Sequence, residues 1–179
     1  MNDDAEVIQS ILAGDPESFR ILVQRYEAAL CRLVRNLTHD LTDWEDVAQD
    51  VFVSAYQHLA RFDSRRASFA TWLFTIARNK CFNAMKRRRP QLVRDLPERA
   101  DCRTPDLCLS EKEWFDQLDA ALDALPFEQQ TVFVLAEIHE LPLEEIGQIE
   151  GVPLGTVKSR LSRAKEKLRE FLRPTVEQP

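Results

Sequence analysis

The sequence has 179 residues, a formal net charge of −6 at pH 7 and only four glycines. No run approaches the roughly 18–20 apolar residues of a membrane-spanning helix, and the acidic N-terminus MNDDAEVIQS is not a signal peptide. The length suits one domain or two small ones, and many leucines, alanines, glutamates and arginines favour helices. We therefore expect an all-α cytoplasmic protein without membrane insertion.

Charge alternates in blocks along the chain, although the total is acidic. Residues 61–90 hold nine basic and one acidic side chain, and residues 154–179 hold seven basic and three acidic ones. Residues 1–60 and 91–153 are net acidic. This distribution predicts two nucleic-acid-binding surfaces, with acidic surfaces left for protein partners. The alternative interpretation is chance clustering of charges on solvated helix faces.

The first 60 residues contain three helical patterns. Apolar residues at 7–12 indicate a short amphipathic helix, and Asp15 with Pro16 opens a longer one that runs to about residue 39. Thr42 and Glu45 form a capping box for a helix over 43–60. On this helix an acidic outer strip is expected, and it consists of Asp43, Asp46, Gln49 and Asp50. A solvated helix face is the alternative explanation for the strip.

Aromatic residues are mixed with cations over residues 62–89. A loop at 62–69 leads into a helix of about 18 residues that begins at Ser68 or Thr71. Unstacked bases need stacking surfaces, amide groups and cations, so this segment is a candidate site for single-stranded DNA. The aromatic rings could instead fill the core. The candidate DNA contacts are Arg65, Ser68, Phe69, Trp72, Arg78, Asn79, Lys80, Asn83, Lys86 and Arg87.

Helical periodicity fails between Pro90 and about residue 109, where prolines interrupt a polar stretch, so we expect a flexible linker there. Ser110 and Glu113 then cap a new helix, and Pro126 starts another. These two helices and the hairpin that follows them predict a C-terminal domain of four helices. Residues 174–179 should fray.

Residues 142–172 predict two helices joined by a tight turn. Gly151 supplies a left-handed residue that ends the first helix, and Pro153 prevents its continuation. Apolar residues on the second helix form an inward stripe from Leu154 to Phe171, and its other face is basic. This is the shape that enters a DNA major groove, although an ordinary helical hairpin is the alternative. The residues placed to meet base edges are Gly155, Thr156, Lys158, Ser159, Ser162 and Arg163.

Two strings carry a family resemblance: PLGTVKSRLSRAKEKLR and TWLFTIARN. The first resembles the second domain of bacterial RNA polymerase sigma factors of the extracytoplasmic-function group, and the second resembles that group's promoter-melting segment. The resemblance covers about residues 14–90 and 111–172. It implies a domain over 1–90, a linker over 91–110, a helix-turn-helix domain over 111–173 and a tail over 174–179.

The resemblance also implies function. The helix over 43–60 would dock on the clamp coiled coil of core RNA polymerase through Asp46, Gln49 and Asp50. The loop 62–69 and Asn79 would capture a base flipped out of the downstream (−10) promoter element, and the C-terminal helix would read the upstream (−35) element as duplex. Core polymerase, promoter DNA and an anti-sigma factor are the expected partners.

Two other classes of function compete with this one. A helix-turn-helix regulator acting without a sigma role needs a dimer helix or a ligand pocket, and the rest of the chain holds a second basic helix and an acidic strip instead. An enzyme is disfavoured because no nucleophile–base pairing, Gly-rich phosphate loop or metal-ligand cluster is evident. Cys31, Cys81, Cys102 and Cys108 form no CxxC pair, so we expect reduced thiols, no metal and no cofactor or small-molecule substrate.

Overall fold

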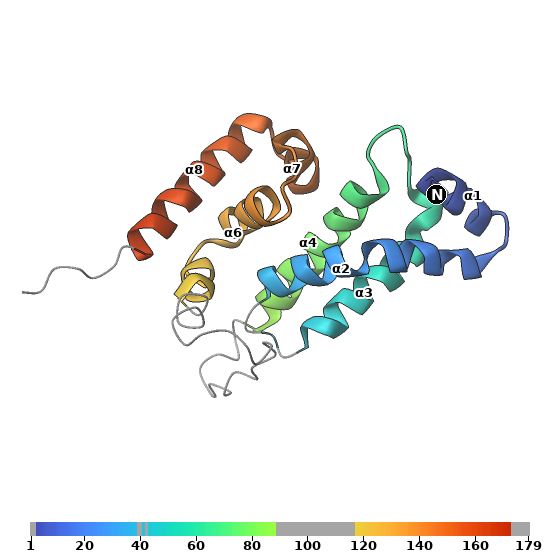
Figure 1. Ribbon diagram of the computed structural model, residues 1–179, viewed down its shortest axis with the longest axis horizontal. Helices are drawn as coiled ribbons and strands as arrows, with labels where there is room; N and C mark the ends of the chain where they lie inside the picture. Colours follow the sequence, from blue (N-terminus) through green and yellow to red (C-terminus); the bar gives the residue numbers. More distant parts are fainter. Residues whose placement is uncertain (1–2, 39–40, 42, 89–116, 173–179) are drawn as a thin grey trace, which may run out of the picture.

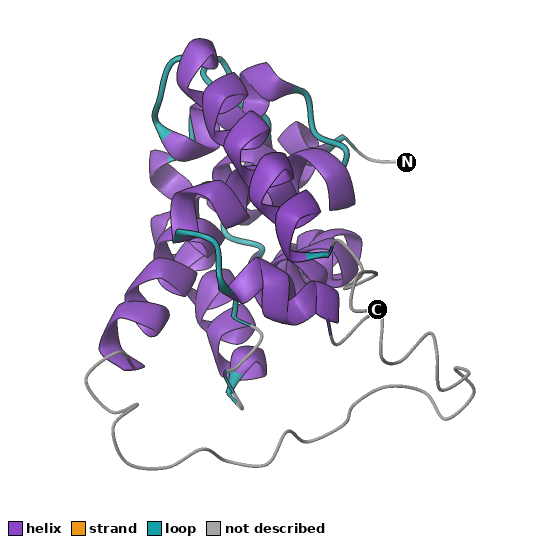
Figure 2. Ribbon diagram, turned by 90° about the vertical axis from the view of Figure 1, so that its left-hand side faces the viewer, coloured by secondary structure: helices purple, strands orange, loops and turns teal. Residues whose placement is uncertain are grey.

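The computed structural model describes residues 3–38, 41, 43–88 and 117–172. The described chain consists of helices and their connections, with no strand among those residues (Figure 2). This agrees with the all-α prediction. The predicted linker 91–110, the Thr42 side of the capping box, and Ser110 and Glu113 lie outside the described residues.

The N-terminal half begins with α1 (Asp4–Leu12), a 3₁₀ turn η1 (Pro16–Ser18) and α2 (Phe19–Leu37). α1 is the short amphipathic helix expected, and it packs against α2 through buried Val7, Ile8 and Ile11. Arg25 and Tyr26 of α2 both bind the carboxylate of Asp4, so polar contacts also hold α1 in place. Pro16 starts the 3₁₀ turn, and the longer helix therefore begins three residues later than predicted.

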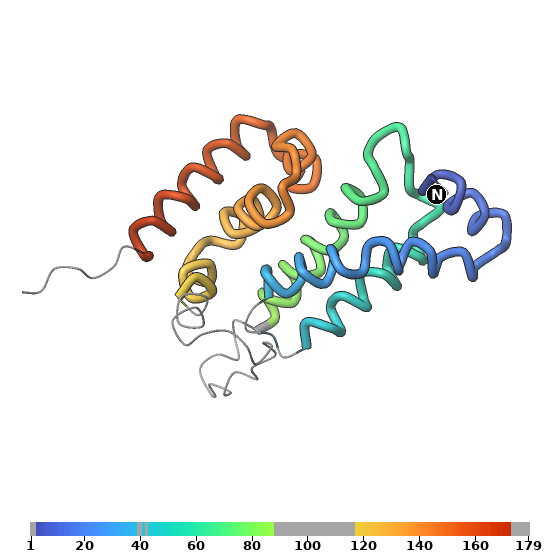
Figure 3. Tube along the Cα trace, in the orientation of Figure 1, coloured from blue at the N-terminus to red at the C-terminus, as the bar shows by residue number. Residues whose placement is uncertain are grey.

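α3 (Trp44–His58) and the 3₁₀ turn η2 (Leu59–Arg61) follow. The inward face of this segment consists of Ala48, Val51, Ala55 and Leu59, all buried. α4 (Phe69–Arg88) is the next helix, and the loop that precedes it forms a projecting bend (Figure 3). Ser68 Oγ accepts a hydrogen bond from the Thr71 backbone N–H at 3.1 Å, so Ser68 caps α4.

The C-terminal half holds a helical stretch at 117–123, α6 (Phe127–Phe133), the π-helical turn η3 (Val134–Ile138), α7 (Leu143–Glu150) and α8 (Leu154–Phe171). Pro126 and Pro142 stand at the N-caps of α6 and α7. Ala164 and Leu168 of α8 pack with buried Leu122. The predicted inward stripe ends too late, because Phe171 is 54% exposed and Leu172 contacts that cluster instead.

The two halves pack against each other rather than standing apart. α7 contacts α4, and α6 contacts α2 (Figure 1). One apolar core runs across the boundary, since Val34 and Leu73 from the N-terminal half and Val132, Leu135 and Ile146 from the C-terminal half belong to the same cluster. At roughly 25 cal/mol per Å² of buried apolar surface, such a shared core favours the packed arrangement.

Candidate nucleic-acid interface

The turn between α7 and α8 is built by two glycines. Gly151 has φ +66°, a left-handed conformation that side chains rarely adopt, and it ends α7 as predicted. Gly147 lies where the turn passes close to α7: a Cβ there would be 3.0 Å from the backbone oxygen of Val152. The Val152 N–H donates to the Gly147 carbonyl at 3.0 Å. α7 and α8 are thus fixed in a tight helix-turn-helix.

The outward face of α8 carries the predicted base-reading residues. Gly155, Lys158, Ser159, Ser162 and Arg163 are exposed, and Thr156 is half-buried. Val157 and Ala164 are buried on the opposite face and hold the helix against its domain. The structure thus brings all six predicted side chains and backbone positions together on the first turns of one helix. Donors on such a face can reach base edges in a major groove.

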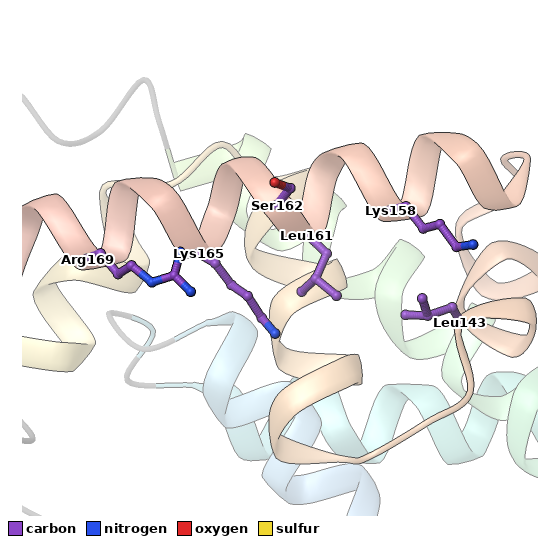
Figure 4. Close-up of a pocket in the computed structure, with 6 residues that line it drawn as sticks. All are labelled: Leu143, Lys158, Leu161, Ser162, Lys165 and Arg169. Carbon is purple, nitrogen blue, oxygen red and sulfur yellow. The ribbon is translucent and has the colours of Figure 1, made fainter.

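A shallow groove runs beside this face. It is lined by Leu143, Lys158, Leu161, Ser162, Lys165 and Arg169, and its volume is about 270 Å³ (Figure 4). Lys165 Nζ lies 2.8 Å from Glu137 Oε1 in η3, so this cation is already paired. The α8 side of the groove carries Lys158, Lys165 and Arg169, and Lys158 and Ser162 are also among the predicted base contacts.

The second predicted DNA surface lies on α4 and the loop before it. Asn79, Asn83, Lys86 and Arg87 are exposed on α4, and Arg65 and Ser68 are exposed in the loop. Lys80 Nζ is 3.6 Å from Asp50 Oδ2 of α3, which joins a predicted DNA contact to a predicted polymerase contact. Arg78 differs from the others because its side chain is only 18% exposed.

The aromatic residues of this region form a cluster of Tyr26, Phe62, Phe69 and Trp72, with ring centroids 5.3–5.8 Å apart in the contacting pairs. Phe69 is only 2% exposed. The prediction that Phe69 contacts DNA is therefore wrong for this conformation, because burying its ring among three others makes it part of the core. Trp72 is half-buried, and it remains a candidate contact.

Asp46, Gln49 and Asp50 are all exposed on α3, at spacings that place them on one face of the helix. The acidic strip expected from the sequence is therefore present and accessible. Val53, one turn further along the helix, is 47% exposed, and Tyr56 is 44% exposed. The strip thus has an apolar continuation.

Sequence reasoning missed Glu150. Its side chain is fully buried, and its carboxylate binds two arginines: Arg78 Nε at 2.9 Å and Arg160 Nη1 at 2.7 Å. Burial raises the pKa of Glu150 above its usual range, and the two arginines oppose that shift. From the sequence, a glutamate near the end of a helix is expected to be exposed to solvent. No local pattern pairs residue 150 with residue 78.

The environments of the two described thiols, Cys31 and Cys81, favour the protonated, unreactive form. Cys81 is buried, which raises the pKa of its thiol to about 12, and burial also raises the pKa of half-buried Cys31. Cys102 and Cys108 lie outside the described residues. Within the described ranges no group of His, Cys, Asp and Glu could hold a metal ion, and no helix there is long and apolar enough to cross a membrane.

Comparisons with known proteins agree with this geometry. The family model for Sigma-70 region 2 matches residues 22–91, and the model for Sigma-70, region 4 matches residues 115–168. The ECF RNA polymerase sigma factor SigW of Bacillus subtilis is 32% identical over 93% of this chain and 95% of its own. The RNA polymerase sigma-H factor of Pseudomonas aeruginosa is 30% identical over 96% and 94%.

Solved structures give the same result. CnrH in complex with the cytosolic domain of CnrY is 26% identical, with a TM-score of 0.71 over 93% of this chain and 94% of that one. The sigma factor RpoE in complex with the anti-sigma factor NepR from Bartonella quintana is 25% identical, with a TM-score of 0.72 over 90% and 99%.

The two sigma-70 regions and the 32% identity to an ECF sigma factor over 93% of the chain show that this protein belongs to the extracytoplasmic-function (ECF) group of RNA polymerase sigma factors. It is a subunit that binds core RNA polymerase and promoter DNA to initiate transcription. The alternative of a helix-turn-helix regulator without a sigma role is not favoured, because residues 22–91 match a sigma region rather than a dimerisation or ligand-binding domain.

Proposed function

We propose that the two basic surfaces divide promoter recognition between duplex and opened DNA. α8 reads the upstream element in the major groove, with Lys158 and Arg163 donating to guanine acceptors. Ser159 and Ser162 lie between them, Gly155 and Thr156 precede Lys158, and these four residues complete the contact surface. The observation that carries this assignment is the exposed row of donors on the first turns of α8, directly after the tight Gly151 turn.

The downstream element is bound as a separated strand by α4 and the loop before it. The Asn79 amide can both donate to and accept from the edge of an unstacked base, and Asn83 offers the same chemistry one turn on. Lys80, Lys86 and Arg87 neutralise the backbone, a contribution that depends on salt and carries no sequence information. Arg65, Ser68, Trp72 and Arg78 flank this face.

Core polymerase docks on the acidic strip of α3. Asp46, Gln49 and Asp50 are accessible together, and complementary charge steers such an encounter and fixes its register. The domain limits we propose are 1–90 for this N-terminal unit, 91–110 for the linker, 111–173 for the helix-turn-helix unit and 174–179 for the tail.

Regulation by a protein partner also fits. CnrH and RpoE are each described in a complex, RpoE with an anti-sigma factor, and an anti-sigma factor is the corresponding partner proposed for this chain. The chain would act by binding and strand separation in the cytoplasm and would leave the chemistry to the polymerase.

The test is reconstitution. The purified chain is mixed with core polymerase, and transcript start sites are mapped on genomic DNA fragments. We expect discrete starts that share upstream and downstream elements and that are absent with core polymerase alone. Binding to DNA without any core-dependent start would support a regulator instead.

A further inference from the structure

The seam between the two halves is partly apolar. Phe82 of α4 meets Phe127 of α6 with ring centroids 5.4 Å apart, and Phe74 of α4 meets His139 edge-on at 5.6 Å. The side chain of Gln130 in α6 donates to the backbone oxygen of Asn36 in α2 at 3.2 Å. These contacts favour the packed state but give no reason for a buried charge in the seam.

The buried charge is Glu150, the last residue of α7. It links Arg78 of α4 to Arg160 of α8, because its Oε1 accepts from Arg78 and its Oε2 accepts from Arg160. Arg78 is further held over the rings of Phe82 and Phe127, at 5.5 and 5.6 Å from their centroids. A second polar contact on α7, Thr71 Oγ1 to Glu145 Oε2 at 3.1 Å, crosses the same seam.

Arg78 is the position where this seam meets the proposed DNA surface. Asn79 and Asn83 beside it are exposed, whereas the Arg78 guanidinium is covered by α7 and neutralised by Glu150. Arg78 donates its Nε–H to Glu150 at 2.9 Å and its Nη1–H to Asn79 Oδ1 at 3.2 Å, so two of its donor groups are engaged within the protein. The Glu150 carboxylate thus neutralises the charge on Arg78 that would attract a DNA phosphate.

In the packed arrangement the two proposed DNA surfaces are also too close together to reach both promoter elements at once. A compact chain of this length is roughly 40 Å across, from a radius of gyration of about 16 Å. Elements about 25 base pairs apart, at 3.4 Å per pair, are separated by roughly 85 Å. The 28 residues between α4 and residue 117 can span up to roughly 95 Å when extended, so covalent geometry permits separation.

We propose that Glu150 is an autoinhibitory clasp: by binding Arg78 across the seam, it holds a closed conformation in which the two DNA surfaces cannot engage one promoter. The predicted effect on promoter binding rests on the proposed function, whereas the clasp itself rests on the Glu150–Arg78 contact across the seam. Opening releases Arg78 to DNA, while Glu150 keeps Arg160 and the turn of the helix-turn-helix in place.

The test compares two glutamate-to-glutamine variants of the full chain. Glu150→Gln removes the clasp charge, whereas Glu145→Gln removes an equal charge from the same helix and leaves an oxygen to accept from Thr71. Small-angle X-ray scattering gives the radius of gyration of each. We expect an increase of several Å for Glu150→Gln and none for Glu145→Gln. Arg78→Met breaks the clasp from the α4 side and should open the chain equally.

A second readout is the affinity for a fluorescein-labelled single-stranded 12-mer, measured by anisotropy. Glu150→Gln should bind it about threefold to tenfold more tightly than wild type, and adding Arg78→Met should remove the gain. An unchanged radius for both Glu150→Gln and Arg78→Met, with circular dichroism reporting native helix content, overturns the clasp. An increased radius without any gain in DNA affinity keeps the clasp and instead counts against the proposed DNA role of Arg78.

Discussion

Arg163 is an exposed side chain two turns into α8. If it donates to a guanine, Arg163→Ala should cost about 1–3 kcal/mol of discrimination at one upstream position. Competition binding of holoenzyme to promoters that differ only at that base pair measures this loss. Lys167→Ala is the matched control, because a phosphate contact should weaken binding equally for all sequences. Equal losses on every sequence with Arg163→Ala would contradict the assignment.

His139 gives a pH prediction. Burial lowers the pKa of His139 to about 4, and Arg32 adds to the shift. Its Nε2 has no hydrogen-bond partner in the described part of the chain, and its ring contacts Phe74. The unfolded chain therefore binds a proton at this histidine at higher pH than the folded chain does. The free energy of unfolding should be highest above about pH 6.5, where His139 is neutral in both states, and it should fall as the pH drops toward 4.

Urea unfolding of wild type and His139→Leu at several pH values checks this. The variant should lose the part of the pH slope between about 6.5 and 4 that comes from this residue, whatever its stability at neutral pH. An identical slope in both proteins would show that His139 does not titrate as its burial implies.

At the scale of single elements, the α7–α8 turn depends on Gly147. Gly147→Ala would push a methyl group against the Val152 carbonyl, so we expect a loss of about 1–3 kcal/mol in the free energy of unfolding. Gly155→Ala is the control: nothing lies within 4 Å of a Cβ there, and alanine is the better helix former, so stability should rise by about 0.5–1 kcal/mol. Chemical denaturation measures both, and equal effects would contradict the close-approach argument.

The acidic strip on α3 gives a second prediction for an element. Asp46→Lys with Asp50→Lys should lower affinity for core polymerase at least tenfold, because reversing two accessible charges turns attraction into repulsion. The exposed Lys80–Asp50 pair contributes about 0–1 kcal/mol, so the fold should persist. Glu17→Lys with Glu27→Lys carries the same charge change away from α3 and should bind normally. A pull-down showing unchanged affinity for the α3 variant would remove the strip from the interface.

Local chemistry made most elements predictable. Proline at 126 and 142, the capping serine at 68 and the left-handed Gly151 each act within one turn of the chain, and the structure confirms the boundaries they predict. Phe171 shows the limit of periodicity. The helical spacing predicts that it belongs to the apolar stripe of α8, but its side chain is exposed at the end of the helix. Phe69 shows a second limit, because the mixture of rings and cations does not reveal which ring packs inward.

At the scale of the whole molecule, the class of protein was predictable and the packing of its halves was not. The sequence predicted two domains joined by a flexible linker, whereas in the structure the two halves share a common core and have a buried carboxylate between them. Arg78 and Glu150 are 72 residues apart, and each belongs to a helix whose own pattern is complete without the other. Only the assembled fold brings them together.

The central claim is that one chain reads duplex DNA with α8 and opened DNA with α4. Permanganate reactivity of downstream thymines, measured on holoenzyme–promoter complexes, tests it most directly. Asn79→Ala should leave duplex binding nearly intact and lower thymine reactivity, while Arg163→Ala should lower duplex binding itself. A template melted in advance should restore reactivity only in part for Asn79→Ala, since the amide contact to the unstacked base is still missing. Normal opening by Asn79→Ala on both duplex and pre-melted templates would contradict the division of labour.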